Sequence, residues 1–377
     1  MKNIVILATG GTIAGAGEQG KDIGYKSGSI KAQTLIDAIP ELKNVANICV
    51  EQFCNINSDD VTSEIWIALA KRIQELLQRD DVDGIVIMHG TDTMEETAFF
   101  LSLTLGGSAP SAAEIAAKPV IMTGSMRPAT AAEPDGPANL LFAVKTAVSC
   151  SPHELSCPPL VIPDPVPGRD HPLVNAKNAT SSWSNATGSS AVYVAFAGKL
   201  MNARSVQKIH ANDLDAFAEL SCPPHELSCP PLVIPDPVPG GHLPLVNAKN
   251  SFDISNMREL PRVSVLYFNA DADAELVRFA AERSAGLVIA GAGAGEFSRA
   301  WADALTDVVS KNKIPIVIST RINRGRIVPE QLLVPGTIAA YDLPPAKAAV
   351  LLRLALTTTN DPAAIQNFFE TSFILPS

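Results

Sequence analysis

Long apolar runs are missing from this 377-residue sequence. No run approaches the roughly 20 residues that a membrane-spanning helix needs, so we expect no interaction with a membrane. An excess of positive charge is missing too: the formal net charge is −10. This balance argues against nucleic acid as a partner and favours a small-molecule substrate. The N-terminus lacks the apolar core and cleavage site of a signal peptide, so we expect a cytoplasmic protein, or a periplasmic one if a leader has been removed.

Cysteine is scarce outside one duplicated segment. Residues 149–178 and 221–250 match at an offset of 72, differ at only 4 of 30 positions, and hold four of the six cysteines. Their proline density excludes helix and central strand and favours an extended conformation or an ordered loop. Zinc binding is an alternative role for the repeated Cys-x2-His-x3-Cys pattern. It is disfavoured by the flanking prolines and the duplication, so we expect no metal. The pattern consists of Cys150, His153 and Cys157, and of Cys222, His225 and Cys229.

Strand-like and helix-like patterns alternate along most of the chain, and its length suggests two domains. This alternation predicts an α/β protein with a large doubly wound domain, built on a parallel sheet, plus a smaller C-terminal α/β domain. We place the N-terminal catalytic domain at 1–217, with a proline-rich insertion at about 149–190. A linker at 218–259 holds the second proline-rich copy, and the C-terminal domain covers 260–377. The expected strands are 4–8, 84–88, 119–123, 192–196, 263–267, 286–290 and 314–318. The expected helices are 31–39, 63–77, 94–105, 136–148, 274–283, 300–310 and 345–357.

Two of the predicted strands end in threonine and glycine. Residues 4–8 lead into Thr9-Gly-Gly-Thr12, and residues 84–88 lead into His89-Gly-Thr-Asp-Thr93. In open parallel sheets, ligands bind beyond the carboxyl ends of the strands. We therefore expect Thr12, Thr91 and Asp92 at the rim of one cleft.

A threonine hydroxyl is a weak nucleophile and needs a base and an oxyanion stabiliser. Thr12 follows two glycines that permit close backbone approach. Tyr25 lies in a glycine-flanked segment suited to closing over a cleft as a lid. A lysine beside Thr91 and Asp92 would lower the proton affinity of Thr91 or accept its proton.

Structural explanations of the same residues compete with these. The first turn is explicable as packing alone. In the second, Asp92 or Thr93 is a candidate N-cap of the following helix, with Glu95 or Glu96 in its first turn. His89, inside a buried strand, is better explained as a hydrogen-bonded core histidine. Residues 291–295 suggest a phosphate loop only weakly, because no lysine follows.

Three motifs carry a family resemblance. They are Ala8-Thr-Gly-Gly-Thr-Ile-Ala14, His89-Gly-Thr-Asp-Thr-Met-Glu-Glu96, and Gly124-Ser-Met-Arg-Pro128 followed by Asp135-Gly-Pro137. Together they resemble bacterial type II L-asparaginases and glutaminase-asparaginases, over about residues 1–148, 191–217 and 252–377. The duplicated proline-rich segment is not typical of that family. The resemblance implies hydrolysis of the side-chain amide of L-asparagine, giving L-aspartate and ammonia through a threonine acyl-enzyme. It also implies a homotetramer built as a dimer of intimate dimers, and no cofactor.

The resemblance assigns the catalytic residues. Thr12 matches the nucleophile and Tyr25 the activating tyrosine on a mobile loop. Thr91 and Asp92 match a second catalytic set whose lysine follows a strand. Lys208 fits that position because it comes soon after residues 192–196. Lys177 does not fit, because no such strand leads into it.

The resemblance also assigns a substrate-binding set, with departures from the family pattern. Ser58, Gly90 and Ser125 match it, whereas Asp59 replaces the usual glutamine or glutamate. Ala294 replaces an asparagine that enters the neighbouring subunit's site. Glu330 is our candidate for the carboxylate that the neighbouring subunit donates. Two alternatives stay open: a glutaminase-asparaginase of mixed specificity, and a catalytically impaired asparaginase-fold scaffold that presents proline-rich segments.

Overall fold

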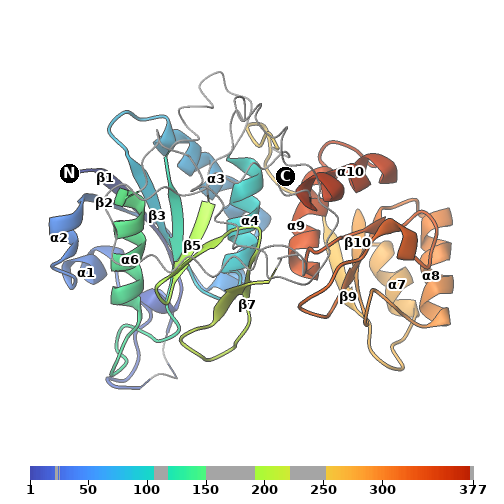
Figure 1. Cartoon of the computed structure of the whole chain (residues 1–377), viewed down its shortest axis with the longest axis horizontal. Coiled ribbons are helices and arrows are strands. Elements are labelled where there is room, and N and C mark those ends of the chain that lie inside the picture. Colours follow the sequence, from blue (N-terminus) through green and yellow to red (C-terminus); the bar gives the residue numbers. More distant parts are fainter. Residues whose placement is uncertain (22–23, 25, 106–117, 150–191, 221–251, 374–377) are drawn as a thin grey trace, which may run out of the picture.

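The computed structural model describes residues 1–21, 24, 26–105, 118–149, 192–220 and 252–373. Tyr25, Lys177, most of both proline-rich copies and the candidate zinc ligands lie outside the described residues. Within the described part, two sheets with their helices lie side by side, the N-terminal one on the left in Figure 1 and the C-terminal one on the right. The predicted domain limits at 217/218 and 259/260 stay predictions.

The larger sheet has six strands in the order β2-β1-β3-β4-β5-β6. Its first five strands are parallel and β6 is antiparallel to β5. The central strands β3, β4 and β5 are wholly buried, which explains their unbroken apolar sequence. The predicted doubly wound parallel sheet is therefore confirmed, with one antiparallel edge. The strands are β1 (Asn3–Gly10), β2 (Asn47–Ile56), β3 (Gly84–Met88), β4 (Val120–Thr123), β5 (Val192–Phe196) and β6 (Lys199–Asn202).

Helices cover both faces of this sheet (Figure 1). Alternating side chains of β1 go to opposite faces: Val5 and Leu7 pack with α3 and α4, whereas Ile4 and Ile6 pack with α1, α2 and α6. Each face thus has its own apolar core. The helices are α1 (Ala32–Asp37), α2 (Leu42–Val45), α3 (Ser63–Leu77), α4 (Met94–Thr104) and α6 (Gly136–Ser149).

The smaller sheet has four parallel strands in the order β12-β11-β10-β9. Helices α7 and α8 pack on one face, and α9 contributes to the same core cluster as α3 and α4. The two domains therefore share apolar packing through α9, which stands between α4 and the C-terminal sheet in Figure 1. The elements are β9 (Val263–Tyr267), α7 (Glu275–Ala281), β10 (Gly286–Gly291), α8 (Arg299–Lys311), β11 (Ile316–Thr320), β12 (Ile338–Ala339), α9 (Pro345–Ala355) and α10 (Pro362–Phe373).

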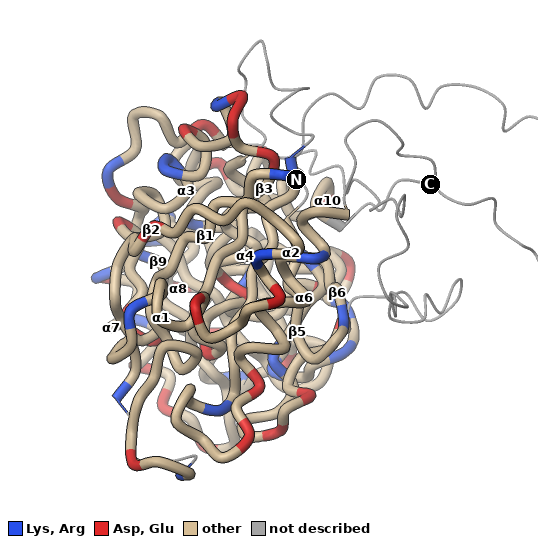
Figure 2. Tube along the Cα trace, turned by 90° about the vertical axis from the view of Figure 1, so that its left-hand side faces the viewer, with Lys and Arg blue, Asp and Glu red and all other residues tan. Residues whose placement is uncertain are grey.

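A short antiparallel hairpin follows β6. It pairs β7 (Val206–Lys208) with β8 (Phe217–Glu219), and Lys208 lies opposite Phe217. Over the described trace, acidic and basic residues are interspersed rather than gathered by sign (Figure 2). None of the helices in the described ranges is long and apolar enough to cross a membrane.

Candidate active site

Two glycines bring the ends of β1 and β3 into contact. Gly11 has φ of 78°, and a Cβ on it would lie 2.5 Å from the Cα of Gly90. Only glycine tolerates both the conformation and the approach. Thr12, the first residue of the 3-10 helix η1 (Thr12–Ala14), follows Gly11, and Thr91 follows Gly90. The glycine contact therefore places both threonines at the same edge of the sheet.

Lys208 joins Thr91 and Asp92. Its Nζ lies 2.9 Å from Oγ1 of Thr91 and 2.5 Å from Oδ1 of Asp92. Thr91 is 4% exposed, the Lys208 side chain 15%, and the Asp92 side chain 68%. The predicted contact of the three residues is confirmed. The buried hydroxyl meets the lysine on one side, while the carboxylate leaves an oxygen open to solvent.

Ser58 supports the turn that carries Asp92. It begins the 3-10 helix η2 (Ser58–Asp60) and is buried. Its Oγ accepts a hydrogen bond from the N–H of Asp92 at 3.2 Å. A Cβ on Gly90 would meet that Oγ at 2.7 Å, so Ser58 also depends on a glycine at 90. The next residue, Asp59, is exposed at the same rim.

The start of α4 agrees in part with the interpretation of this motif as helix capping, because Glu95 and Glu96 lie in its first turn as expected. Thr93 occupies the N-cap position, but its side chain makes no cap hydrogen bond. Its Oγ1 instead donates to the carbonyl oxygen of Ser58 at 2.7 Å. Glu95, expected to act chiefly in the helix start, accepts a hydrogen bond at Oε2 from the N–H of Lys208 at 2.5 Å. Both side chains therefore hold the site together.

The turn after β4 packs against the Thr91 turn. A Cβ on Gly124 would lie 2.4 Å from the carbonyl oxygen of His89 and 3.5 Å from Cγ2 of Thr91. Ser125 is buried, and its Oγ donates to the carbonyl oxygen of Arg127 at 2.7 Å. The Asp135 carboxylate accepts hydrogen bonds from the N–H groups of residues 126 and 127, both at 2.9 Å. Asp135 thus shapes the turn in which Gly124 approaches Thr91 and Ser125 follows.

His89 is buried and fully hydrogen-bonded. Its Nδ1 lies 2.7 Å from the carbonyl oxygen of Gly90, which can only accept, so Nδ1 carries the proton. Its Nε2 then accepts from the hydroxyl of Thr97, at 3.1 Å, and that hydroxyl accepts from Nε1 of Trp66 at 2.8 Å. Burial lowers the pKa of His89 to about 4. The interpretation as a neutral core histidine is confirmed.

Two further positions lie away from this edge. Glu330 is exposed in the 3-10 helix η3 (Pro329–Gln331) of the C-terminal domain. There it adds, after burial and Glu370, to the raised pKa of Tyr341. Ala294 is exposed in a tight turn closed by backbone hydrogen bonds between residues 292 and 296. That turn explains the glycines of 291–295 without a phosphate.

Metal ligation finds no support among the described side chains: no three His, Cys, Asp or Glu residues there are grouped to hold an ion.

The comparisons with known proteins agree with this geometry. Residues 3–155 match the model of the "Asparaginase, N-terminal" family, and residues 262–369 match the "Glutaminase/Asparaginase C-terminal domain". The chain belongs to the asparaginase family. L-asparaginase 2 of Bacillus subtilis is 36% identical over 375 residues, covering 98% of this chain and 86% of that protein. Glutaminase-asparaginase of Pseudomonas fluorescens is 32% identical, covering 98% and 90%.

A solved asparaginase structure is similar over the whole length. It is the crystal structure of a probable cytoplasmic L-asparaginase from Campylobacter jejuni, with a TM-score of 0.72 and 34% identity. The similarity covers 98% of this chain and 99% of that one. The α/β fold predicted from the sequence is therefore shared with a solved member of the family.

Proposed function

We propose that this asparaginase-family chain hydrolyses the side-chain amide of L-asparagine to L-aspartate and ammonia through a threonine acyl-enzyme. The observation that carries the proposal is the contact of Lys208 Nζ with Oγ1 of Thr91 and Oδ1 of Asp92. It lies at the sheet edge to which the Gly11–Gly90 contact also brings Thr12. The names of the relatives, L-asparaginase and glutaminase-asparaginase, support the same chemistry.

The proposed reaction has two halves. The hydroxyl oxygen of Thr12 attacks the amide carbon, an ester forms, the C–N bond breaks, and the nitrogen leaves as ammonia with the threonine proton. Backbone N–H groups and Thr91 stabilise the oxyanion. Water then attacks the ester, aspartate leaves, and Thr12 regains its proton. Tyr25 activates Thr12 from the loop, while Thr91, Lys208 and Asp92 manage the second set of protons. No metal or organic cofactor enters these steps.

We assign substrate binding to the rim around this pair. Ser58, Gly90 and Ser125 line it, and the exposed carboxylates of Asp59 and Asp92 complement the substrate ammonium. Glu330, donated by a neighbouring subunit, completes the set. An aspartate at position 59 reaches less far than the glutamine or glutamate usual in the family, so we expect weaker discrimination between related amides.

A mixed glutaminase-asparaginase is the second candidate, because relatives that match nearly the whole chain carry that name. The ratio of kcat/KM for asparagine to that for glutamine separates the two. A strong excess for asparagine supports an asparaginase, and comparable values support the mixed enzyme.

Ammonia release from purified protein tests the main proposal. We expect Thr12→Ala and Thr91→Ala each to lower kcat by about 100-fold or more, because each removes a group that acts in the transition state. Thr306→Ala is the matched control, since that hydroxyl donates only to its own helix in α8. Full activity of either site variant, or no ammonia from either amide with the wild type, contradicts the proposal.

We also propose that the chain forms a homotetramer, a dimer of intimate dimers. Five of the eight exposed large apolar side chains among the described residues lie in the C-terminal domain, and exposed apolar surface favours association. They are Tyr267, Leu276, Phe279, Ile322 and Leu333. Light scattering on a size-exclusion column measures the mass. A monomer contradicts this proposal and also removes the role given to Glu330.

A further inference from the structure

The placement of Lys208 depends on more than its own side chain. It ends β7, a strand of three residues paired only with β8 among the described strands. A hairpin this short is marginally stable by itself. Several of the contacts that fix the segment before Lys208 come from the C-terminal domain.

Lys347 makes three of these contacts. It lies in α9, is 0% exposed, and its Nζ donates to three carbonyl oxygens of one turn. The acceptors are Ala203 at 3.0 Å, Arg204 at 2.8 Å and Val206 at 2.5 Å. An ammonium has three donors, so the turn between β6 and β7 satisfies all of them. Lys347 thereby fixes the chain two residues before Lys208.

Burying this lysine is unfavourable, and the surroundings compensate only in part. Burial lowers the pKa of Lys347 to about 8, opposed mainly by the nearby Glu95. Burial of an amine costs folding free energy unless its hydrogen bonds are made, and an apolar side chain at this position of α9 would pack equally well. Because its three partners are carbonyl oxygens of one turn, we infer that the buried ammonium stabilises the shape of the turn at residues 203–206.

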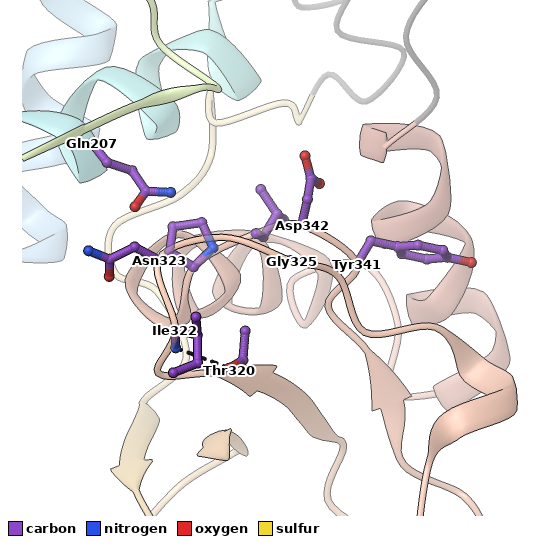
Figure 3. A pocket seen from close by; sticks show the side chains of 9 residues that line it. Gln207, Thr320, Ile322, Asn323, Gly325, Tyr341 and Asp342 are labelled. Carbon is purple, nitrogen blue, oxygen red and sulfur yellow. Dashed lines mark hydrogen bonds between the residues drawn. The ribbon is translucent and has the colours of Figure 1, made fainter. Parts of the chain in front are cut away.

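A second anchor holds the same turn. Both Nη atoms of Arg204 donate to the Asp342 carboxylate, and its Nε donates to the carbonyl oxygen of Ser372 at 2.5 Å. Gln207 of β7 lines a pocket together with Asn323 and Asp342 of the C-terminal domain (Figure 3). The turn and β7 therefore contact the C-terminal domain as well as the larger sheet, where the N–H of Ala203 donates to the carbonyl oxygen of Val192 in β5.

The other side of Lys208 is held by α4. Glu95 Oε2 accepts its N–H at 2.5 Å, so the backbone of Lys208 lies between α4 and the turn that Lys347 fixes. A displacement of about 1 Å at a catalytic group costs up to about 100-fold in rate. Loss of the Lys347 contacts would allow such a displacement without touching the substrate.

We propose that Lys347 is a positioning residue that holds the turn at residues 203–206 so that Lys208 reaches Thr91. The C-terminal domain thus contributes to catalysis within its own chain. This inference rests on the proposed amidohydrolase function.

Lys347→Met tests it in the full-length protein. Methionine is unbranched and only one atom shorter than lysine, so it keeps most of the packing but donates no hydrogen bond. We expect kcat to fall by about 10- to 100-fold with KM for asparagine changed by less than about 3-fold, because the substrate rim is untouched. Arg353→Met is the matched control: it removes a largely buried cation from the same helix, with a hydrogen bond to Val263 instead of the turn. The inference is overturned if kcat/KM falls only because KM rises, or if kcat falls equally in Lys347→Met and Arg353→Met.

A double variant separates positioning from general destabilisation. If Lys347 acts through Lys208, adding Lys347→Met to Lys208→Met leaves the residual rate unchanged, whereas independent effects multiply. Multiplying effects overturn the inference. Should Lys347→Met fail to fold, Asp342→Asn removes the second anchor, and an unchanged kcat in that variant overturns the inference instead. An inactive wild type refutes the proposed function and the inference with it. An active wild type with an unaffected Lys347→Met refutes the inference alone.

Discussion

The Nζ of Lys208 lies 2.9 Å from the hydroxyl oxygen of Thr91, 117 positions earlier in the chain. The contact joins the end of a central parallel strand to the end of a short hairpin strand. Between them in sequence stands the first proline-rich copy, residues 149–178. The contact of Lys208 with Thr91 forms in the chain that contains this segment.

Glu95 should affect the rate through Lys208. We expect Glu95→Ala to lower kcat by about 5- to 100-fold, because a partly buried N–H left without an acceptor costs up to about 1–3 kcal/mol and the Lys208 backbone is released. Glu95→Gln keeps a carbonyl acceptor and should retain most of the activity. Steady-state kinetics of both variants checks this. Equal losses in the two would show that the charge of Glu95, not its hydrogen bond, is what matters.

Gly11 should be irreplaceable for two separable reasons. Gly11→Ala combines an unfavourable positive φ with a Cβ placed 2.5 Å from the Cα of Gly90. We expect a loss of about 2–4 kcal/mol in the free energy of unfolding, together with lost activity as Thr12 moves from Thr91. Gly20→Ala is the control: φ there is 83°, but nothing lies within 4 Å of the new Cβ.

That control should lose only about 1 kcal/mol, the cost of the conformation alone. Chemical denaturation of the two variants and the wild type measures both effects. Similar losses in the two variants would mean that the approach of Gly11 to Gly90 does not constrain the site.

Elements with strong local signals were predictable from the sequence. The limits of α3, β3 and β5 match the expected ranges 63–77, 84–88 and 192–196, because buried strands are short and unbroken and α3 has one apolar face. The edge strand β2 was not predicted, since its half-exposed positions mix polar and apolar residues. The three-residue strands β7 and β8 carry too little pattern to detect.

The residues of the candidate site also differ in how far the sequence predicts them. Thr91 and Asp92 were identifiable because they follow a buried strand, and Lys208 because of the family pattern. The contact of Glu95 with Lys208 spans 113 positions, and that of Lys347 with Val206 spans 141. Neither leaves a local signal, because in sequence Glu95 resembles an ordinary helix-start acid and Lys347 a surface lysine. Only tertiary structure reveals what these two charges hold.

His89 should make stability depend on pH. Its pKa is about 4 in the folded protein, below the ordinary 6.5, because burial disfavours the charged ring. The unfolded chain therefore binds a proton first as pH falls, and stability present above pH 6.5 is lost on the way to pH 4. We expect the difference in free energy of unfolding between the wild type and His89→Gln to shrink by up to about 3 kcal/mol as pH falls across that window. Urea unfolding at a series of pH values measures it, with His210→Gln, at an exposed site, as control. A pH-independent difference would contradict the assignment.

Glu96 should change the pH dependence of stability in the opposite direction, over nearly the same pH range. Burial, and then Glu95, raise the pKa of Glu96 from 4.5 to about 7, against the opposing effect of Arg353 and Lys347. The folded protein thus holds a proton that the unfolded chain releases. The resulting stability is fully present below pH 4.5 and is lost as pH rises through 7.

Glutamine at this position has no proton to lose. The free energy of unfolding of Glu96→Gln, relative to that of the wild type, should therefore rise by about 1–3 kcal/mol between pH 4.5 and 7.5. Urea unfolding at fixed protein concentration checks the sign, and a gain that falls with pH would refute it. His89 and Glu96 change the free energy of unfolding in opposite directions as pH rises. The stability of the wild type should therefore vary less with pH than that of either single variant. The double variant His89→Gln with Glu96→Gln should return to a nearly flat profile, and a steep one would show that a third group titrates in this window.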